Sequence, residues 1–379
     1  MHKTRRLWAV GLVAALAVIG AACSSDSKTT TNSSSSTTGS SSASAAGLTI
    51  DYTKLSGTIT GSGSSFQDTF DQAVITALKA KAAGLTVTYT KSSSGAGISD
   101  LATATKAFIG TDRAVKDAEK GTFTGGDFLY FPTVAAPITV SYNLTGVDKT
   151  KPLLLDGATL TKIFSGTITT WSDPAIAATN SGVTGLTGNI VVCHRDADSG
   201  TTANFTSFLD KADHADMTLQ VGGNPNNWPA GSIAGAGNGG VASCITGNPG
   251  GIGYVDVADA IKANLTFASV KNTAGKFIQP TLDGTKAAVA ASVSTLKADL
   301  TYDPINASGD ASYPITSPTW IVVYKNQSTK AQGDAVKGFL NFVLTDGQQQ
   351  AASAGYSPLS SDLQQKAIDQ LNQLVIPAS

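Results

Sequence analysis

The sequence has few charged residues and no excess of either sign. Only 14% of its 379 residues are charged, and 26 Lys and Arg against 27 Asp and Glu give a formal net charge of −1. Nucleic-acid binding requires a basic surface, so this composition argues against a nucleic-acid partner. With 379 residues, of which 41% are hydrophobic, the chain is long enough for two domains with proper cores.

The sequence also lacks the usual signatures of enzymes and metal sites. It has 3 His and 3 Cys, and it contains no C-x-x-C, H-E-x-x-H or G-x-S-x-G motif. We therefore predict no catalytic residue, no metal and no cofactor. A secreted serine hydrolase with His194 as its base is a less favoured alternative, because His194 and Arg195 are adjacent on a strand and should point to opposite faces.

The N-terminus has the pattern of a secretory signal. Basic residues precede a short apolar stretch, and small residues then lead to Cys23. We predict a signal peptide over 1–22 and acylation of Cys23, as in a bacterial lipobox. The Ser/Thr-rich residues that follow can bury little apolar surface, so the segment 23–50 is predicted to be a flexible tether.

Beyond the tether, strand-like and helix-like segments alternate, which indicates an α/β fold with helices flanking mostly parallel sheets. Two helical stripes have apolar residues three or four positions apart, one over residues 66–78 and one over 336–343. Segments with β-branched, strand-like character are Leu85–Tyr89, Ile138–Tyr142, Ile190–Cys193 and Trp320–Tyr324.

Three segments share one local pattern, in which a strand is followed by a Ser/Gly-rich loop and then by a helix start. They are residues 61–66 (GSGSSF), 92–97 (SSSGAG) and 198–202 (DSGTT). The first turn of a helix presents free N–H groups and a positive dipole end, so such loops bind phosphate-like anions. The alternative is ordinary capping, and residues 65–68 also fit a capping box.

Cys193 and Cys244 remain once Cys23 is assigned to the lipid. Outside the cytoplasm, an even pair of cysteines is a candidate disulfide, and two buried free thiols are the alternative.

The residues from about Gly57 to the C-terminus resemble the PstS-type phosphate-binding lipoproteins of bacterial phosphate ABC transporters. The stretches that carry the resemblance, in chain order, are GSGSSF, YTKSSSGAGISDL, FIGTDRAV, FPTVAAPITVSYNLTGV, LLLDGATLTKIFSGTITTWSDPAI, VVCHRDADSGTTANFTSFL, GNGGVASCITGNPGGIGYV and YPITSPTWIVVYK. The resemblance implies a periplasmic-binding-protein fold, in which two α/β lobes enclose a ligand cleft and are joined by hinge crossings. Lobe I would be 51–140 plus 279–379, and lobe II would be 141–278.

The family's phosphate-binding residues carry over where the motifs match. They fall on Ser65, Phe66, Ser94, Asp112, Arg195, Ser199, Gly200 and Thr201. Ser65 replaces the Thr of some relatives and keeps the hydroxyl. Some relatives carry an aspartate two residues after the arginine, whereas this chain has Ala197 there, so another group must orient Arg195.

Asp112 would select the ligand, because a carboxylate can accept a hydrogen bond from protonated phosphate but repels sulfate. The alternatives are a binding protein for sulfate, molybdate or arsenate and, with the long tether as its only support, a structural surface lipoprotein. The resemblance implies inorganic phosphate as the ligand and the transmembrane subunits of an ABC permease as partners. It also implies a monomer that a lipid anchor holds on the outer face of the cell membrane.

Overall fold

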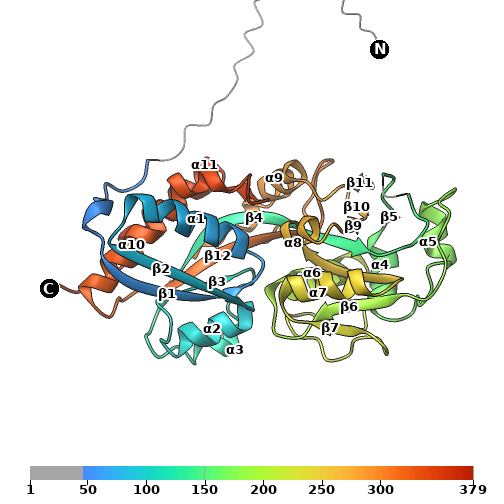
Figure 1. The fold of residues 1–379 in the computed structure, drawn as a ribbon, viewed down its shortest axis with the longest axis horizontal. Coiled ribbons are helices and arrows are strands. Elements are labelled where there is room, and N and C mark those ends of the chain that lie inside the picture. Colours follow the sequence, from blue (N-terminus) through green and yellow to red (C-terminus); the bar gives the residue numbers. More distant parts are fainter. Residues whose placement is uncertain (1–45, 149, 379) are drawn as a thin grey trace, which may run out of the picture. The chain divides into compact units, whose positions relative to one another are not determined.

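Two neighbouring strands, β4 (Phe128–Tyr142) and β12 (Thr316–Tyr324), run through the middle of the protein (Figure 1). The computed structural model describes residues 46–148 and 150–378. The predicted signal peptide, Cys23 and the tether up to residue 45 therefore lie outside the described residues. Leu48 belongs to the segment predicted as a tether, but its N–H donates to Asn341 Oδ1 at 2.8 Å. Its main chain is therefore held against α10 (Lys330–Leu344).

Most strands belong to one mixed sheet with the order β2-β1-β3-β12-β4-β8-β6-β7. Strands β13 and β9 add to β4, and a smaller sheet has the order β11-β10-β5. The remaining strands are β1 (Gly57–Ser64), β2 (Leu85–Ser92), β3 (Phe108–Thr111), β5 (Leu154–Leu155), β6 (Val191–Arg195), β7 (Ile233–Gly235), β8 (Gly251–Asp256), β9 (Thr266–Phe267), β10 (Ser269–Lys271), β11 (Phe277–Ile278) and β13 (Ser357–Pro358).

Helices cover the sheet in the way the sequence predicts for an α/β fold. Figure 1 shows α1 and α10 on one side of β1 to β3 and α2 on the other. The other helices are α1 (Asp68–Lys81), α2 (Ser94–Ala102), α3 (Asp117–Lys120), α4 (Gly157–Phe164), α5 (Pro174–Thr179), α6 (Gly200–Ala212), α7 (Gly237–Gly247), α8 (Val257–Lys262), α9 (Leu282–Ala291) and α11 (Ser361–Gln370). None of the helices in the described residues is long and apolar enough to span a membrane.

The prediction of mostly parallel sheets is wrong for the centre. Strands β1, β2 and β3 are parallel, and so are β6, β7 and β8. Between these two sets, β12 runs antiparallel to both β3 and β4, and β4 runs antiparallel to β8. The difference arises because β4 and β12 do not belong to a βαβ repeat and instead connect the two parallel sets.

Strand β4 extends through both halves of the sheet, with a different partner at each end. Its residues from Phe128 to Pro137 pair with β12, and those from Ile138 to Tyr142 pair with β8. We call β2, β1, β3 and β12 with their helices the β1 part, and β8, β6 and β7 with theirs the β6 part. The chain passes from one part to the other within a continuous strand.

Strand β12 illustrates how the sequence produces a fully buried strand. Its side chains alternate between the two faces of the sheet. Ile321 and Val323 join the large core cluster, whereas Trp320 and Val322 join a second cluster beneath α2. The uninterrupted apolar run 320–324 is explained by this burial on both faces.

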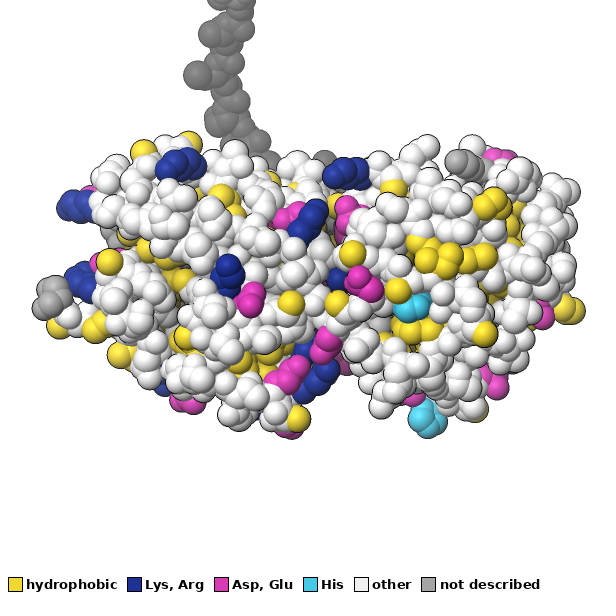
Figure 2. Space-filling model, turned by 60° about the horizontal axis from the view of Figure 1, so that its bottom comes forward, with side chains coloured by type: hydrophobic (Ala, Val, Ile, Leu, Met, Phe, Trp, Pro, Cys, Tyr) yellow, Lys and Arg dark blue, Asp and Glu magenta, His cyan; other side chains and the backbone are white. Residues whose placement is uncertain are grey.

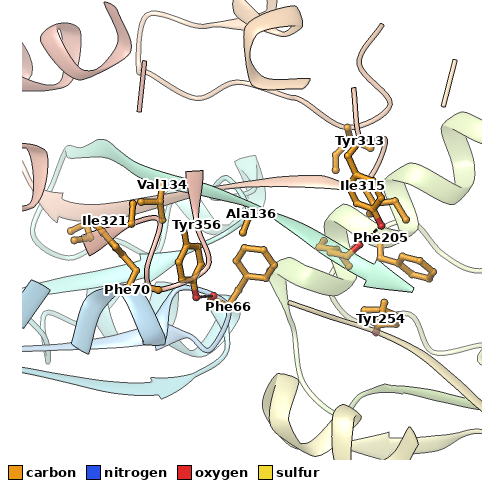
Figure 3. Close-up of a cluster of buried hydrophobic side chains, with 14 of the residues drawn as sticks. Phe66, Phe70, Val134, Ala136, Phe205, Tyr254, Tyr313, Ile315, Ile321 and Tyr356 are labelled. Carbon is orange, nitrogen blue, oxygen red and sulfur yellow. Dashed lines mark hydrogen bonds between the residues drawn. The ribbon is translucent and has the colours of Figure 1, made fainter. Parts of the chain in front are cut away.

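The large core cluster extends through both parts along β4 (Figure 3). On the side of the β1 part, the Tyr356 hydroxyl donates to the Phe66 carbonyl at 2.6 Å. Where β4 begins to pair with β8, the Tyr313 hydroxyl donates to the Ile138 carbonyl at 2.8 Å. Buried tyrosines need a partner for the hydroxyl, and both use a main-chain oxygen next to the junction between the parts.

A disulfide joins Cys193 in β6 to Cys244 in α7, with 6.0 Å between their Cα atoms. It fastens α7 to the strand that carries Arg195. The start of α7 lies close to the end of β6 because Arg195 pairs with Gly235, two residues before the helix.

Candidate functional site

The Ser/Gly-rich segments after β2 and β6 begin helices as predicted, whereas residues 61–64 of the first segment belong to strand β1. Helix α2 has Ser93 as its N-cap and α6 has Ser199, each with its side chain accepting a main-chain N–H. Helix α1 differs, because it begins at Asp68 with Gln67 as an N-cap that makes no side-chain bond. The capping box over residues 65–68 is therefore wrong, and Ser65 and Phe66 lie in the connection before the helix.

Asp112, at the end of β3, is the centre of a buried cluster of hydroxyl groups. Its side chain is 1% exposed. Asp112 Oδ1 accepts hydrogen bonds from Ser64 Oγ at 2.6 Å and from Ser94 Oγ at 2.5 Å, and Oδ2 accepts one from Thr201 Oγ1 at 3.0 Å. Thr201 belongs to α6 of the β6 part, so this carboxylate joins the two parts of the protein.

Gly200 is the residue that permits this approach. A Cβ atom at position 200 would lie 2.2 Å from Asp112 Oδ1 and 2.6 Å from Ser94 Oγ. Any other residue would push α6 away from Asp112.

Arg195, the last residue of β6, is buried without an ion pair among the residues that the structure describes. It is 4% exposed, and burial lowers the pKa of its guanidinium. Its Nη1 donates to Ser199 Oγ at 2.8 Å and its Nη2 to the Ser92 carbonyl at 3.3 Å. Within the described chain, its Nε has no partner. A buried guanidinium in this state is prepared to receive an anion.

Neither aspartate beside Ala197 orients Arg195. Asp196 is exposed, and the Asp198 carboxylate pairs with Arg113 and Lys116. The hydroxyl of Ser199 and the carbonyl of Ser92 therefore hold the guanidinium in place.

Asn238 joins the site, and sequence reasoning missed it. It lies at the start of α7, is fully buried, and its N–H donates to Ser65 Oγ at 3.2 Å. Its Nδ2 contacts Thr201 Oγ1 at 3.4 Å, whereas Oδ1 has no partner within the described residues. The stretch GNGGVAS at residues 237–243 begins another Gly-rich helix and was the available signal.

Ser64 is a further member of the cluster around Asp112 that the sequence did not predict, and the predicted Phe66 N–H is bonded within the chain. The Phe66 N–H donates to Ser64 Oγ at 3.0 Å, and the Phe66 ring is fully buried in the core. Ser64 contacts Asp112, whereas the Ser65 hydroxyl accepts the Asn238 N–H. Residues 61–65 are all buried, so alternation of burial could not have distinguished Ser64 from Ser65.

A cavity of about 410 Å³ opens beside Arg195 and Asn238 at the boundary between the two parts, which we call the seam. The β1 part contributes Ser65 and Lys91 to its lining, and the β6 part contributes Arg195, Asn238 and Asp259. A second cavity of about 510 Å³ lies beside Asp112 and Arg113. Figure 2 shows charged side chains of both signs gathered along this seam.

His194 does not take part in a hydrolase-like arrangement. Its ring stacks on Trp228 with 4.4 Å between centroids, and its Nδ1 contacts the Arg195 carbonyl at 2.8 Å. Burial lowers the pKa of His194. In the described part of the chain, no group of His, Cys, Asp and Glu could hold a metal ion.

Sequence comparison identifies the family. Residues 28–347 match the family described as the PBP superfamily domain. The phosphate-binding protein PstS of Pasteurella multocida is 32% identical over 318 residues, which cover 84% of this chain and 91% of that protein. PstS3 of Mycobacterium bovis is 30% identical and covers 97% of this chain and 98% of that protein. The chain belongs to the PstS family of phosphate-binding proteins.

Solved structures agree on the fold of this PstS-family chain. A phosphate-binding protein from Stenotrophomonas maltophilia has a TM-score of 0.63 at 20% identity and covers 83% of this chain and 94% of its own. A high-affinity periplasmic phosphate-binding protein solved with phosphate at pH 8.5 has a TM-score of 0.67 at 22% identity, covering 83% and 93%. The predicted family, fold class and non-enzymatic binding role are confirmed.

Proposed function

We propose that this protein captures inorganic phosphate at the seam between the β1 and β6 parts and delivers it to an ABC-type phosphate permease. The observation that carries the proposal is the pair formed by Asp112 and Arg195. Both are buried and of opposite formal charge, yet the Asp112 carboxylate is bonded to hydroxyl groups and the Arg195 guanidinium to Ser199 and Ser92. A ligand that satisfies both must carry negative charge and also offer a hydrogen to a carboxylate.

Asp112 supplies the selectivity for a protonated oxyanion. A carboxylate has about four lone-pair sites, and hydroxyl groups of Ser64, Ser94 and Thr201 occupy three of them. The remaining site accepts a hydrogen bond from a P–OH group. Sulfate has no proton at neutral pH, so it would bring an unprotonated oxygen against a buried carboxylate.

The other predicted residues supply donors to the phosphate oxygens. Arg195 presents its guanidinium, and Ser199 fixes that group as the N-cap of α6. Gly200 and Thr201 occupy the first turn of α6, where main-chain N–H groups and the dipole favour an anion. Ser65 lines the cavity with its hydroxyl. Phosphate would exchange some of the internal hydrogen bonds of Ser94 and of the Phe66 N–H for its own.

The two parts would act as lobes that close on the ligand. We propose lobe I as 51–140 plus 279–379 and lobe II as 141–278. Strand β4 supports a first crossing at Pro137 and Ile138, where its partner changes from β12 to β8. The chain returns between β11, which pairs with β10, and α9, which contacts β4 and β12.

The N-terminal sequence supports a role outside the cytoplasm. Residues 1–22 would be removed as a signal peptide, and an acylated Cys23 would anchor the protein to the cell membrane through the tether. The transmembrane subunits of the permease would then receive phosphate from a monomeric, tethered binding protein.

Calorimetric titration with phosphate and with sulfate tests the proposal on the wild type and on Asp112→Asn. The wild type should bind phosphate and discriminate against sulfate by about four orders of magnitude, as sites built around one ligand hydrogen do. Asp112→Asn should bind phosphate more weakly and lose most of the discrimination. Absence of phosphate binding by the wild type would refute the function. Tighter binding of sulfate by the wild type would instead indicate a receptor for another oxyanion.

A further inference from the structure

Asp198 does not line the cavity, but it forms several bonds across the seam. Its carboxylate accepts two hydrogen bonds from Arg113, from Nε to Oδ1 at 3.2 Å and from Nη2 to Oδ2 at 3.0 Å. Lys116 Nζ lies 3.0 Å from Oδ2. Its main-chain carbonyl accepts the Gly95 N–H at 2.8 Å. One residue of the β6 part is thus bonded to three residues of the β1 part.

The receiving side of this contact is preorganised. Arg113 is 6% exposed, and Glu119 holds its other edge with Nη1 at 2.9 Å from Oε2 and Nη2 at 2.7 Å from Oε1. Glu119 Oε2 also accepts the Lys116 N–H at 2.7 Å. The guanidinium is therefore fixed within the β1 part and presents its free edge to the β6 part.

The arrangement is also shaped for close approach. A Cβ at Gly95 would lie 2.6 Å from Asp198 Cβ, and a Cβ at Gly223 would lie 1.9 Å from Asp198 Oδ1. The main chain leaves just enough room for the Asp198 carboxylate on both sides. A carboxylate exposed on the surface without close neighbours would not require glycine at either position.

These contacts lie directly beside the proposed phosphate site. Arg113 follows Asp112 in the chain, and Asp198 precedes Ser199. Because the Asp198 side chain is engaged by Arg113 and Lys116, it does not contribute a negative charge to the cavity wall. Its position allows it to act on the ligand only through the closure of the two parts.

We propose that Asp198 is a positioning residue that latches the two parts around phosphate. The latch consists of Asp198, Arg113, Lys116 and Gly95, and it slows phosphate release without contacting the ion. This inference rests on the proposed function, because it assigns a role in release from the same site. It predicts that the latch acts on the dissociation rate and leaves the choice between phosphate and sulfate unchanged.

The test is stopped-flow measurement of phosphate association and dissociation with Asp198→Asn. We expect the dissociation rate to rise by about 10- to 100-fold, because removing one charge from a partly buried ion pair between the two parts acts mainly on dissociation. The ratio of phosphate to sulfate affinity should stay at the wild-type value. Small-angle scattering of the phosphate-free variant should show a larger radius of gyration than the phosphate-free wild type.

Asp117→Asn is the matched control. Asp117 lies in α3 and pairs with Lys120 at 2.7 Å rather than with a residue of the latch, and its side chain is 94% exposed. This variant should leave both rates unchanged. Lys116→Met alone should raise the dissociation rate by about 2- to 5-fold. Added to Asp198→Asn it should raise the rate no further, because each substitution removes the same ion pair between Lys116 and Asp198.

Salt provides a readout that a purely structural residue would not move. The Asp198 side chain is 29% exposed and that of Lys116 is 47% exposed, so added salt should speed release from the wild type but much less from Asp198→Asn. An unchanged dissociation rate in both Asp198→Asn and Lys116→Met would overturn the latch while phosphate binding by the wild type still stood. A collapse of the phosphate-to-sulfate ratio in Asp198→Asn would also overturn it, because Asp198 would then belong to the binding site.

Discussion

Replacing Arg195 by Met should weaken phosphate binding without lowering the free energy of unfolding of the phosphate-free protein. The guanidinium is 4% exposed, and its Nε has no partner among the residues that the structure describes. It is therefore a charge that the fold buries before the ligand arrives. The substitution removes this charge and keeps an unbranched side chain of similar reach.

The expected magnitudes follow from the contacts of Arg195. Burying an ion costs several kcal/mol, and two hydrogen bonds, to Ser199 Oγ and the Ser92 carbonyl, return about 1.5–3 kcal/mol each. These terms nearly cancel. The free energy of unfolding without phosphate should therefore stay constant or rise by up to about 2 kcal/mol. Phosphate affinity should fall by about 30- to 5,000-fold, which corresponds to a loss of about 2–5 kcal/mol.

The assay is urea unfolding of phosphate-free protein together with calorimetric titration of phosphate. Arg113→Met is the matched control, because Arg113 is equally buried but paired with Glu119 and Asp198. Removing one partner of a buried ion pair should lower the free energy of unfolding by about 3–5 kcal/mol. If Arg195→Met destabilised the phosphate-free protein as much as Arg113→Met, the reasoning about an unpaired charge would be refuted.

Two further predictions concern stability. Asp71 in α1 is buried, which raises the pKa of its carboxyl well above 3.8, so the folded state keeps the proton to higher pH than the unfolded state. The free energy of unfolding should therefore fall by about 1.4 kcal/mol per pH unit as pH rises from 3.8 toward the folded-state pKa. Asp71→Asn should remove this slope in urea titrations between pH 3 and pH 7, and a pH-independent difference from the wild type would contradict the burial argument. The disulfide between Cys193 and Cys244 closes a segment with a sequence separation of 51. Replacing both cysteines by Ala should therefore lower the free energy of unfolding by about 4 kcal/mol. Equal urea midpoints for the variant and the oxidised wild type would show that the bond does not stabilise the fold.

Local patterns in the sequence predicted the elements of this fold well. The stripe at 336–343 lies in α10 and the run 320–324 lies in β12, because hydrophobic periodicity depends on which faces are buried. The antiparallel centre was not predictable in this way. An apolar run that is buried on both faces looks the same whichever direction its neighbours take.

The candidate site shows the same division between local and long-range information. Asp112 and Arg195 were predicted because the motifs around them match those of the PstS family. The pairing of Arg113 with Asp198 joins residues 85 positions apart, and Asn238 reaches Ser65 over 173 positions. A local sequence pattern does not indicate which side chains from distant parts of the chain come into contact in the folded protein.

The central claim is that Asp112 selects phosphate by accepting a hydrogen bond from it. The most direct measurement is the ratio of phosphate to sulfate affinity at pH 7 for the wild type and for Asp112→Asn. The account predicts a ratio of about 10⁴ for the wild type and a fall of at least about 100-fold in the variant, because Asn presents no charge to repel sulfate. An unchanged ratio in a folded Asp112→Asn protein would contradict it.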